Sequence, residues 1–248
     1  MRLLLISDIH ANIEALEAAL NAAPEHDEVI DLGDVVGYGA SPNEVVDCVR
    51  GLKKAQHVRG NHDKACAGVM STEQFNPIAA IAAYWTRDML SPGNRKWLAN
   101  MPPGPVQHDG LSDIQFVHGS PLDEDDYLIT PVDAAFAAPE INTRITFFGH
   151  THVQGGFVLH AAGAEAIRPR IQQAPEKLDL KQDARYLINP GSVGQPRDGD
   201  ARAAFAVYDT EAHVVEFHRV QYDIAGAQKR ILDAQLPERL ATRLKDGR

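Results

Sequence analysis

Residues 1–10 read MRLLLISDIH and place Asp8 and His10 directly after a run of four apolar residues, Leu3 to Ile6. Such a run is typical of a short buried strand, so both polar side chains follow the end of a strand. Further short polar clusters follow other apolar runs, namely Gly33-Asp34, Gly60-Asn61-His62-Asp63, His118-Gly119 and Gly149-His150-Thr151-His152. In open α/β sheets ligands bind outside the carboxyl ends of the strands, so we expect these clusters to form one shared site.

The clusters carry the residue types that bind divalent metals. A carboxylate can bridge two cations, and neutral imidazole adds nitrogen ligands; this mixture suits Mn, Fe, Zn or Co. Asn61 adds a neutral carbonyl oxygen. Each cluster alone is weak, because Asp-x-His is commonplace and Gly-Asp is usually a turn. Taken together they supply ligands for two metal ions. The histidines outside them are assigned to surface or core roles: His26, His57, His108, His160, His213 and His218.

The composition limits the class of protein. A chain of 248 residues with 44% hydrophobic content can bury a large core, and we expect one domain over 1–248. The net charge of −10 and the scattered Lys and Arg residues disfavour a nucleic-acid polymer or an anionic membrane as partner. The two cysteines have no metal-type spacing, and the N-terminal apolar run is too short for a signal segment. These features predict a cytoplasmic protein, with a homo-oligomer left open.

The first part of the chain predicts β-loop-α units. A helix should follow the first strand, with Asn12 as its cap. A second unit comprises a strand at 28–32 and a helix at 42–50, for which Ser41 and Glu44 predict a capping box. A short third strand is expected near 56–59.

Residues 71–100 differ in character and predict a helical insertion, with helices capped by Ser71 and Ser91. Its aromatic residues, Phe75, Tyr84, Trp85 and Trp97, either cover the site or form a core between the helices. Residues 222–246 predict a helical C-terminal tail. The rest is predicted to be strands at 105–109, 113–117, 145–149, 155–160, 165–172, 185–188, 203–209 and 213–220. Hairpin-like turns are expected at 109–110, 162–163 and 209–211. Parallel units followed by hairpins indicate two packed sheets with helices outside.

The order D-x-H, G-D, G-N-H-D, H and G-H-x-H resembles that of the calcineurin-like metallophosphoesterase family, over residues 1 to about 208. The resemblance implies a four-layer α/β/β/α sandwich of two mixed sheets flanked by helices. It also implies a dinuclear centre, with one metal held by Asp8, His10 and His152, the other by Asn61, His118 and His150, Asp34 as the bridge and His62 as an unligated catalytic histidine.

One branch of that family continues its second motif to an Asp-Arg-Gly, where this chain has Gly37-Tyr38-Gly39. Protein-phosphatase activity is therefore disfavoured. Residues 33–44 and 189–197 instead resemble small prokaryotic phosphodiesterases of the YfcE-like or diadenosine-tetraphosphatase-like kind. Within the second stretch, Asn-Pro-Gly-Ser is either a tight turn or a direct participant, and Arg197 is the candidate phosphate clamp. Asp63 is assigned either to orienting His62 or to a local cap.

These observations predict a hydrolase that uses two divalent transition-metal ions, with Mn preferred over Fe, Zn, Co or Ni. A hydroxide bridging the metals would attack a phosphodiester or small nucleotide phosphoester, and His62 would assist the leaving group. Two alternatives stay open: a dinucleoside-polyphosphate hydrolase and a non-catalytic scaffold with the same fold. The filled ligand positions favour an enzyme over the scaffold.

Overall fold

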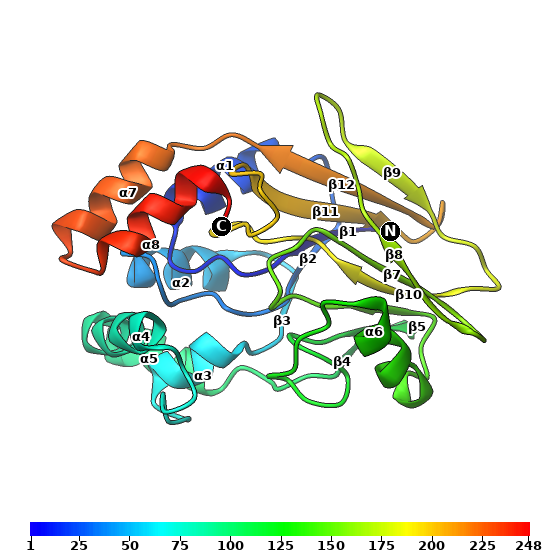
Figure 1. The fold of residues 1–248 in the computed structure, drawn as a ribbon, viewed down its shortest axis with the longest axis horizontal. Coiled ribbons are helices and arrows are strands. Elements are labelled where there is room, and N and C mark those ends of the chain that lie inside the picture. The colour runs from blue at the N-terminus through cyan, green and yellow to red at the C-terminus, as the bar shows by residue number, and fades with distance from the viewer.

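Two mixed six-stranded sheets face each other in the computed structural model, which describes residues 1–248 (Figure 1). The first sheet has the order β3 (Ala55–His57), β2 (Glu28–Asp31), β1 (Arg2–Ile6), β11 (Ala203–Asp209), β12 (Val214–Val220) and β9 (Glu176–Asp179). The second has the order β4 (Val106–His108), β5 (Leu111–Phe116), β6 (Ile145–Phe147), β10 (Arg185–Asn189), β7 (Gly155–His160) and β8 (Gly163–Ile167).

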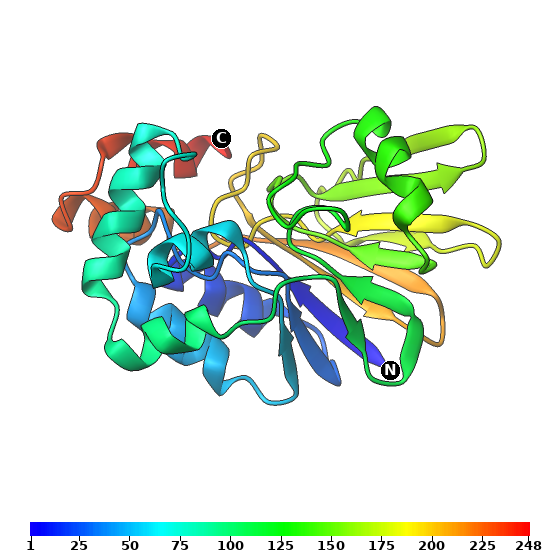
Figure 2. The same ribbon diagram turned by 90° about the horizontal axis from the view of Figure 1, so that it is seen from below.

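Helices cover the outer faces of both sheets (Figure 2). Side chains that alternate between the two faces of β1 explain the layers. Leu3 and Leu5 face the second sheet, whereas Leu4 and Ile6 face the helices. The first sheet packs against α1 (Ile13–Ala22) and α2 (Pro42–Gly51). The second packs against α6 (Pro131–Ala137), which a short 3₁₀ turn at Ala138–Glu140 follows. The predicted fold class, two mixed sheets flanked by helices, is confirmed.

The remaining helices lie at one end of the sandwich (Figure 1). They are α3 (Asn61–Ala67), α4 (Pro77–Met89), α5 (Pro92–Ala99), α7 (Ile224–Asp233), α8 (Glu238–Thr242) and a 3₁₀ turn at Arg243–Asp246. Residues of α4, α7 and α8 form one apolar cluster with Tyr38, which joins the segment 71–100 to the C-terminal residues. No helix is both long and apolar enough to cross a membrane.

Parallel pairing positions the site. Strands β1, β2 and β3 run parallel, and so do β5, β6 and β10. Their carboxyl ends lie at one edge of the sandwich, and the polar clusters follow those ends. The hairpins predicted at 109–110, 162–163 and 209–211 are present, between β4 and β5, β7 and β8, and β11 and β12.

Several sequence predictions need correction. Asn61 begins α3, so the third cluster lies at a helix start. Helix α2 starts at Pro42 as expected, but the predicted capping box is wrong. The Ser41 hydroxyl makes no hydrogen bond to the helix and is buried without a partner. The cap of α4 is Asn76, which accepts from Ala79 N, so the helix starts later than Ser71 predicts.

Besides α3, the sequence did not predict strand β9 and helix α6. Strand β9 has the polar sequence Glu-Lys-Leu-Asp and lies at a sheet edge, where pairing with β12 rather than apolar alternation defines it. Helix α6 is only seven residues long, too short for a clear apolar period, although Thr130 and Asp133 form its capping box.

Candidate metal centre

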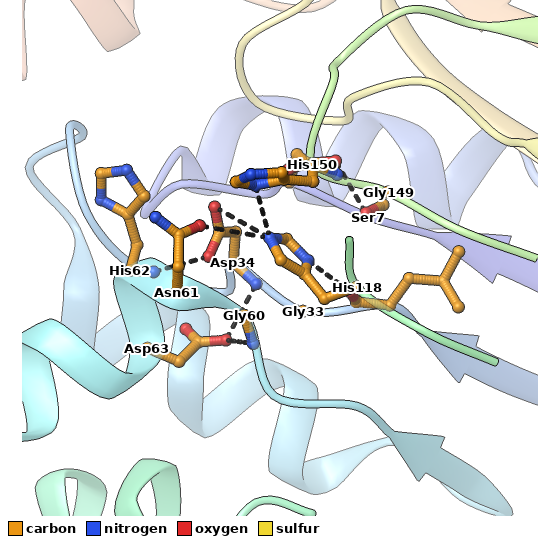
Figure 3. A network of polar contacts seen from close by, with 12 residues as sticks. Ser7, Gly33, Asp34, Gly60, Asn61, His62, Asp63, His118, Gly149 and His150 are labelled. Carbon is orange, nitrogen blue, oxygen red and sulfur yellow. Dashed lines mark hydrogen bonds and ion pairs between the residues drawn. The ribbon is translucent and has the colours of Figure 1, made fainter. Parts of the chain in front are cut away.

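The loops after β1, β2, β5 and β6, together with the start of α3, meet at one point between the two sheets (Figure 3). Two groups of potential ligand atoms form there. Asp8, His10, Asp34 and His152 make the first group, and Asp34, His118 and His150 make the second. Asp34 belongs to both, so its carboxylate lies where one ligand could serve two cations. The structure brings together all seven side chains that were predicted as ligands.

In the first group the distances between ligand atoms are short. His10 Nε2 lies 3.1 Å from His152 Nε2 and 3.6 Å from Asp34 Oδ2. Asp8 Oδ1 lies 3.3 Å from His152 Nε2. In addition, Asp8 Oδ1 is buried without a hydrogen-bond donor, an arrangement that a buried carboxylate oxygen rarely keeps unless a cation completes it.

The second group is built in the same way. His118 Nε2 lies 3.4 Å from Asp34 Oδ2, 3.1 Å from His150 Nδ1 and 3.3 Å from Asn61 Oδ1. Figure 3 shows Asn61, His118 and His150 directed toward the Asp34 carboxylate. The amide oxygen of Asn61 therefore completes a set of oxygen and nitrogen donors around one position.

Backbone carbonyls fix the orientation of the four imidazoles. Each ring directs one nitrogen into the centre and the other to a carbonyl: His10 Nδ1 to Val36 (3.1 Å), His118 Nδ1 to Leu32 (2.7 Å), His150 Nε2 to Asp125 (3.1 Å) and His152 Nδ1 to Gln195 (2.6 Å). Donation to the carbonyl leaves a lone pair on the inward nitrogen. In the first group, the lone pairs of His10 and His152 then face each other at 3.1 Å, which is repulsive without a cation between them. The donor set fits divalent metal ions.

Burial and charge set the protonation of these groups. Burial lowers the pKa of His150 to about 3 and holds the pKa of His10 and His152 well below the usual value, so all three are neutral ligands at neutral pH. Burial also acts to lower the pKa of His118, but Asp34 outweighs it and raises that pKa to about 10. Burial raises the pKa of Asp8 to about 7, although the positive charge of His118 acts to lower it. Metal binding would therefore release protons.

The backbone is held in an unusual conformation at most of these ligands. Non-glycine residues rarely have a positive φ, and such strain concentrates at functional sites. Here the loop residues with φ between 49° and 65° include Asp8, His10, Asp34, His150 and His152. The structure around these residues must therefore offset the free-energy cost of the strained backbone.

A comparison with protein families then identifies the chain. Residues 1–213 match the calcineurin-like phosphoesterase superfamily domain. The chain belongs to this superfamily. The resemblance noted from the motifs is confirmed, and so is the predicted enzyme class, a metallophosphoesterase that acts on phosphoester bonds.

Relatives match the metallophosphoesterase over nearly its whole length. A metallophosphoesterase from Sphaerobacter thermophilus is 42% identical, with a TM-score of 0.86 over 100% of this chain and 99% of that one. An uncharacterized protein of Methanocaldococcus jannaschii is 37% identical over 98% of this chain and 97% of its own length. A hypothetical protein from Pyrococcus horikoshii is 22% identical and shares the fold, with a TM-score of 0.79 over 100% of this chain and 98% of that one.

The Asn-Pro-Gly-Ser stretch of this metallophosphoesterase braces the ligand loops. Asn189 Nδ2 donates to the Gly149 carbonyl at 2.8 Å, and Ser192 Oγ donates to the Asp8 carbonyl at 2.8 Å. Gly149 itself has no space for a side chain, because a Cβ there would lie 2.0 Å from Ser7 Oγ. Of the two roles left open for this stretch, the contacts are those of a structural turn that holds both loops.

Asp63 has the contacts of the local cap, the second of its two predicted roles. Its carboxylate accepts from Gly60 N at 3.0 Å, Asp34 N at 2.8 Å and Val36 N at 3.2 Å. It makes no hydrogen bond to the His62 ring. Asp63 thus starts α3 and also holds the loop that carries Asp34.

The His62 ring lies beside the metal-ligand cluster without joining either ligand group. It packs against His10, Tyr38 and Phe75, with ring centroids 4.9, 4.4 and 4.7 Å away. Its Nδ1 is buried without a partner, while its backbone N–H donates to Asp34 Oδ1 at 2.8 Å. Burial lowers the pKa of His62 to about 4, with Asp34 acting in the opposite direction. The imidazole thus lies next to the centre and is not needed to complete either group of metal-binding atoms.

Arg197 lies at the mouth of the site. Its guanidinium carbon is 5.7 Å from the Tyr38 ring centroid, and its Nη2 donates to Gln195 Oε1 at 3.1 Å. Two pockets adjoin this arginine, one of about 740 Å³ and one of about 500 Å³. The larger one extends past Tyr127 and Phe148 to the segment that follows β8.

Some residues near the site were not predicted. Tyr127 stacks on His150 with ring centroids 3.8 Å apart, and the loop that carries it is anchored by Lys64, whose Nζ donates to Glu124 and Asp125. The sequence of this loop has no period or motif that indicates such a contact. Of the four insertion aromatics, only Phe75 contacts His62, whereas Trp85 belongs to the helical cluster and Trp97 packs on His57.

Proposed function

We propose that this metallophosphoesterase hydrolyses a phosphodiester or small nucleotide phosphoester with two divalent transition-metal ions. The observation that carries the proposal is the position of Asp34, whose Oδ2 lies 3.6 Å from His10 Nε2 and 3.4 Å from His118 Nε2, in both ligand groups. Asp34 would bridge the ions, with the other ligands divided as Asp8, His10 and His152 on one side and Asn61, His118 and His150 on the other.

When bound, such an ion pair lowers the pKa of a water and neutralises charge on phosphoryl oxygens. The mixed nitrogen and oxygen donors favour Mn²⁺ or a neighbouring transition ion over Ca²⁺, which prefers six to eight oxygens.

The residues around the centre would orient the substrate. Arg197 has a guanidinium that can hold two phosphoryl oxygens at once, and it lies between the two pockets. The His62 imidazole, whose ring lies 4.4 Å from the Tyr38 ring, would donate a hydrogen bond or proton to the departing oxygen. The absence of a basic stripe and the size of the pockets favour a small substrate over a polymer.

A dinucleoside polyphosphate is the second candidate substrate. It is favoured by two pockets that share Arg197 as a lining residue and could each take one half of such a molecule.

The test is hydrolysis by the Mn²⁺-loaded protein of a panel of monoesters, diesters and dinucleoside polyphosphates. Asp34→Asn should lose turnover together with bound metal, because a neutral amide cannot bridge two cations, although its oxygen can still accept from His62 N. Asp133→Asn, in the first turn of α6 and in neither ligand group, is the matched control and should keep both. Full activity of the wild type after exhaustive removal of metal, checked by elemental analysis, would rule out the two-metal proposal.

A further inference from the structure

A pocket of about 500 Å³ beside the metal-ligand cluster is lined by three arginines, Arg197, Arg239 and Arg243, and by no acidic residue. They come from distant parts of the sequence, the loop after Asn189-Pro190 and the C-terminal helices. The first residues of α4, Asn76 to Ile78, form another part of the wall, so the positive end of that helix also lies at the pocket. Positive charge is concentrated here in a chain whose net charge is −10.

These three arginines lack the carboxylate partners that six other arginines of the chain have. None forms an ion pair with an Asp or Glu side chain. Arg197 donates to the Gln195 amide, and Arg243 donates from Nε to the Arg248 oxygen. In contrast, carboxylates pair with Arg2, Arg59, Arg144, Arg202, Arg219 and Arg230. The terminal nitrogens of Arg239 and Arg243 remain available to an anion.

The guanidinium groups lie close enough to repel each other. Those of Arg197 and Arg243 both lie over the Tyr38 ring, at 5.7 and 6.0 Å from its centroid. Burial, together with the charge of Arg197, lowers the pKa of Arg243 to about 10. Stacking on one neutral ring offsets only part of this repulsion, whereas an anion between the arginines would remove it.

Tyr38 also connects the pocket to the proposed reaction site. This residue lines the pocket, and its ring centroid is 4.4 Å from that of His62 and 4.7 Å from that of His10. A group leaving on the His62 side would therefore extend past Tyr38 toward Arg239 and Arg243.

We propose that this arginine pocket binds a second phosphate group of the substrate, carried by the leaving group. The inference rests on the proposed hydrolase function and narrows the substrate class to phosphoesters or anhydrides whose leaving group is itself phosphorylated, such as a mononucleotide. Arg239 and Arg243 are then specificity-determining residues, and Arg197 contacts the substrate between the two phosphates.

The first experiment measures binding without catalysis. Inorganic phosphate is titrated calorimetrically into metal-free protein, in which the carboxylates of the empty ligand cluster do not attract anions. Arg239→Gln and Arg243→Gln should each raise the Kd about 10-fold, as expected for the loss of a charged hydrogen bond. Lys245→Gln is the matched control, because this exposed lysine lies on the same 3₁₀ turn as Arg243 but does not line the pocket.

The second experiment compares two substrates with the same scissile bond in the Mn²⁺-loaded protein: adenylyl-(3′,5′)-adenosine with and without a 5′-phosphate. Attack that expels the 3′-oxygen releases AMP from the phosphorylated form and adenosine from the other. The ratio of the two kcat/KM values should favour the phosphorylated form and fall about 10-fold in each arginine variant, but not in Lys245→Gln.

The outcomes separate the two proposals. Equal phosphate affinity in wild type, Arg239→Gln and Arg243→Gln, or an unchanged kcat/KM ratio, overturns the arginine pocket. Phosphate binding that depends on the arginines, in a protein that hydrolyses no phosphoester with any metal, supports the pocket and overturns the proposed function. Arg239 is exposed, so its variant tests the pocket even where Arg243→Gln folds poorly.

Discussion

At the scale of single residues, two arginines from elsewhere in the chain lie beside the stretch where one branch of the family has Asp-Arg-Gly. That stretch is Gly37-Tyr38-Gly39 in this chain. The structure places two other guanidinium groups, of Arg197 and Arg243, over the Tyr38 ring. Tyr38 thus supplies an aromatic surface between the metal-ligand cluster and the arginines.

His62 can be distinguished from the metal ligands by its effect on different leaving groups. His62→Asn should keep both metals, because the ring belongs to neither ligand group. It should slow esters of poor leaving groups about 10²–10⁴-fold relative to p-nitrophenyl esters, whose departing phenolate needs little protonation. Metal analysis and paired kinetics check this. A variant that loses metal, or slows equally on both kinds of ester, would contradict a role at the leaving oxygen.

Asp63 is expected to act through the backbone. Asp63→Asn should lower the free energy of unfolding by about 1–3 kcal/mol, because an amide cannot accept from all three N–H groups that the carboxylate satisfies. Denaturant unfolding measures the change, with exposed Asp133→Asn, which caps α6, as a comparison. Unchanged stability together with lost activity would instead point to a direct role for Asp63 at the reaction.

At the scale of elements, the segment 71–100 is part of the core as well as part of the wall of the site. Ala83, Leu90 and Leu98 pack into the cluster that lies under the first sheet, and Ala79 and Ala82 pack against α7 and α8. Phe75 at its start contacts His62. Removing the whole segment would therefore expose two apolar clusters. Single substitutions separate its contribution to stability from its contribution to the site better than a deletion does.

Leu98→Ala and Ile81→Ala form a matched pair within this segment. Leu98 in α5 is fully buried, and its truncation should cost about 2–5 kcal/mol of unfolding free energy. Ile81 in α4 is 53% exposed, and its truncation should cost less than about 1 kcal/mol. Chemical denaturation of both variants is the measurement, and similar losses in the two would contradict the assignment of α5 to the core.

Phe75→Ala tests the contribution of the segment to the site, because Phe75 contacts the His62 ring. If Phe75 holds the His62 ring, its loss should lower kcat on poor leaving groups more than on p-nitrophenyl esters, in the same direction as His62→Asn but less. Tyr84→Ala is the control, since Tyr84 is 52% exposed and lies away from His62. An equal loss on both ester types would indicate that Phe75 contributes to stability only.

At the scale of the whole molecule, bound metal should link the two sheets. The ligand loops come from β1 and β2 in one sheet and from β5 and β6 in the other. Removing metal with a chelator should lower the Tm, and Mn²⁺ at 100 times its Kd should restore about 2.7 kcal/mol for each bound ion, or roughly 5–11 °C for each. Thermal melts with Mn²⁺ and Ca²⁺ check this. Equal Tm values with Mn²⁺ and with chelator would be inconsistent with a centre that connects the sheets.

The sequence by itself determined the class of fold and the composition of the metal-ligand cluster. Apolar runs of strand length followed by Asp or His account for most of this, because parallel strands bring their carboxyl ends to one edge of the sheet. Asn61 is the exception, since it lies at the start of α3. The hairpin turns were also local features, set by Asp-Gly and similar pairs. The prediction failed at β9, because this strand is defined by its pairing with the distant β12. It also failed at Ser41, where the residue type suggested a cap but the hydroxyl is buried without a partner.

Only the tertiary structure decided what surrounds the cluster. Tyr127 reaches His150 from a loop without a motif, and Arg239 and Arg243 reach the Tyr38 pocket from C-terminal helices that the sequence presents as an ordinary amphipathic tail. Their positions depend on how α4, α7 and α8 pack together, which no local pattern of residues specifies. Strand ends fix the ligands through short-range chain geometry, whereas the substrate pockets depend on the packing of distant helices and loops.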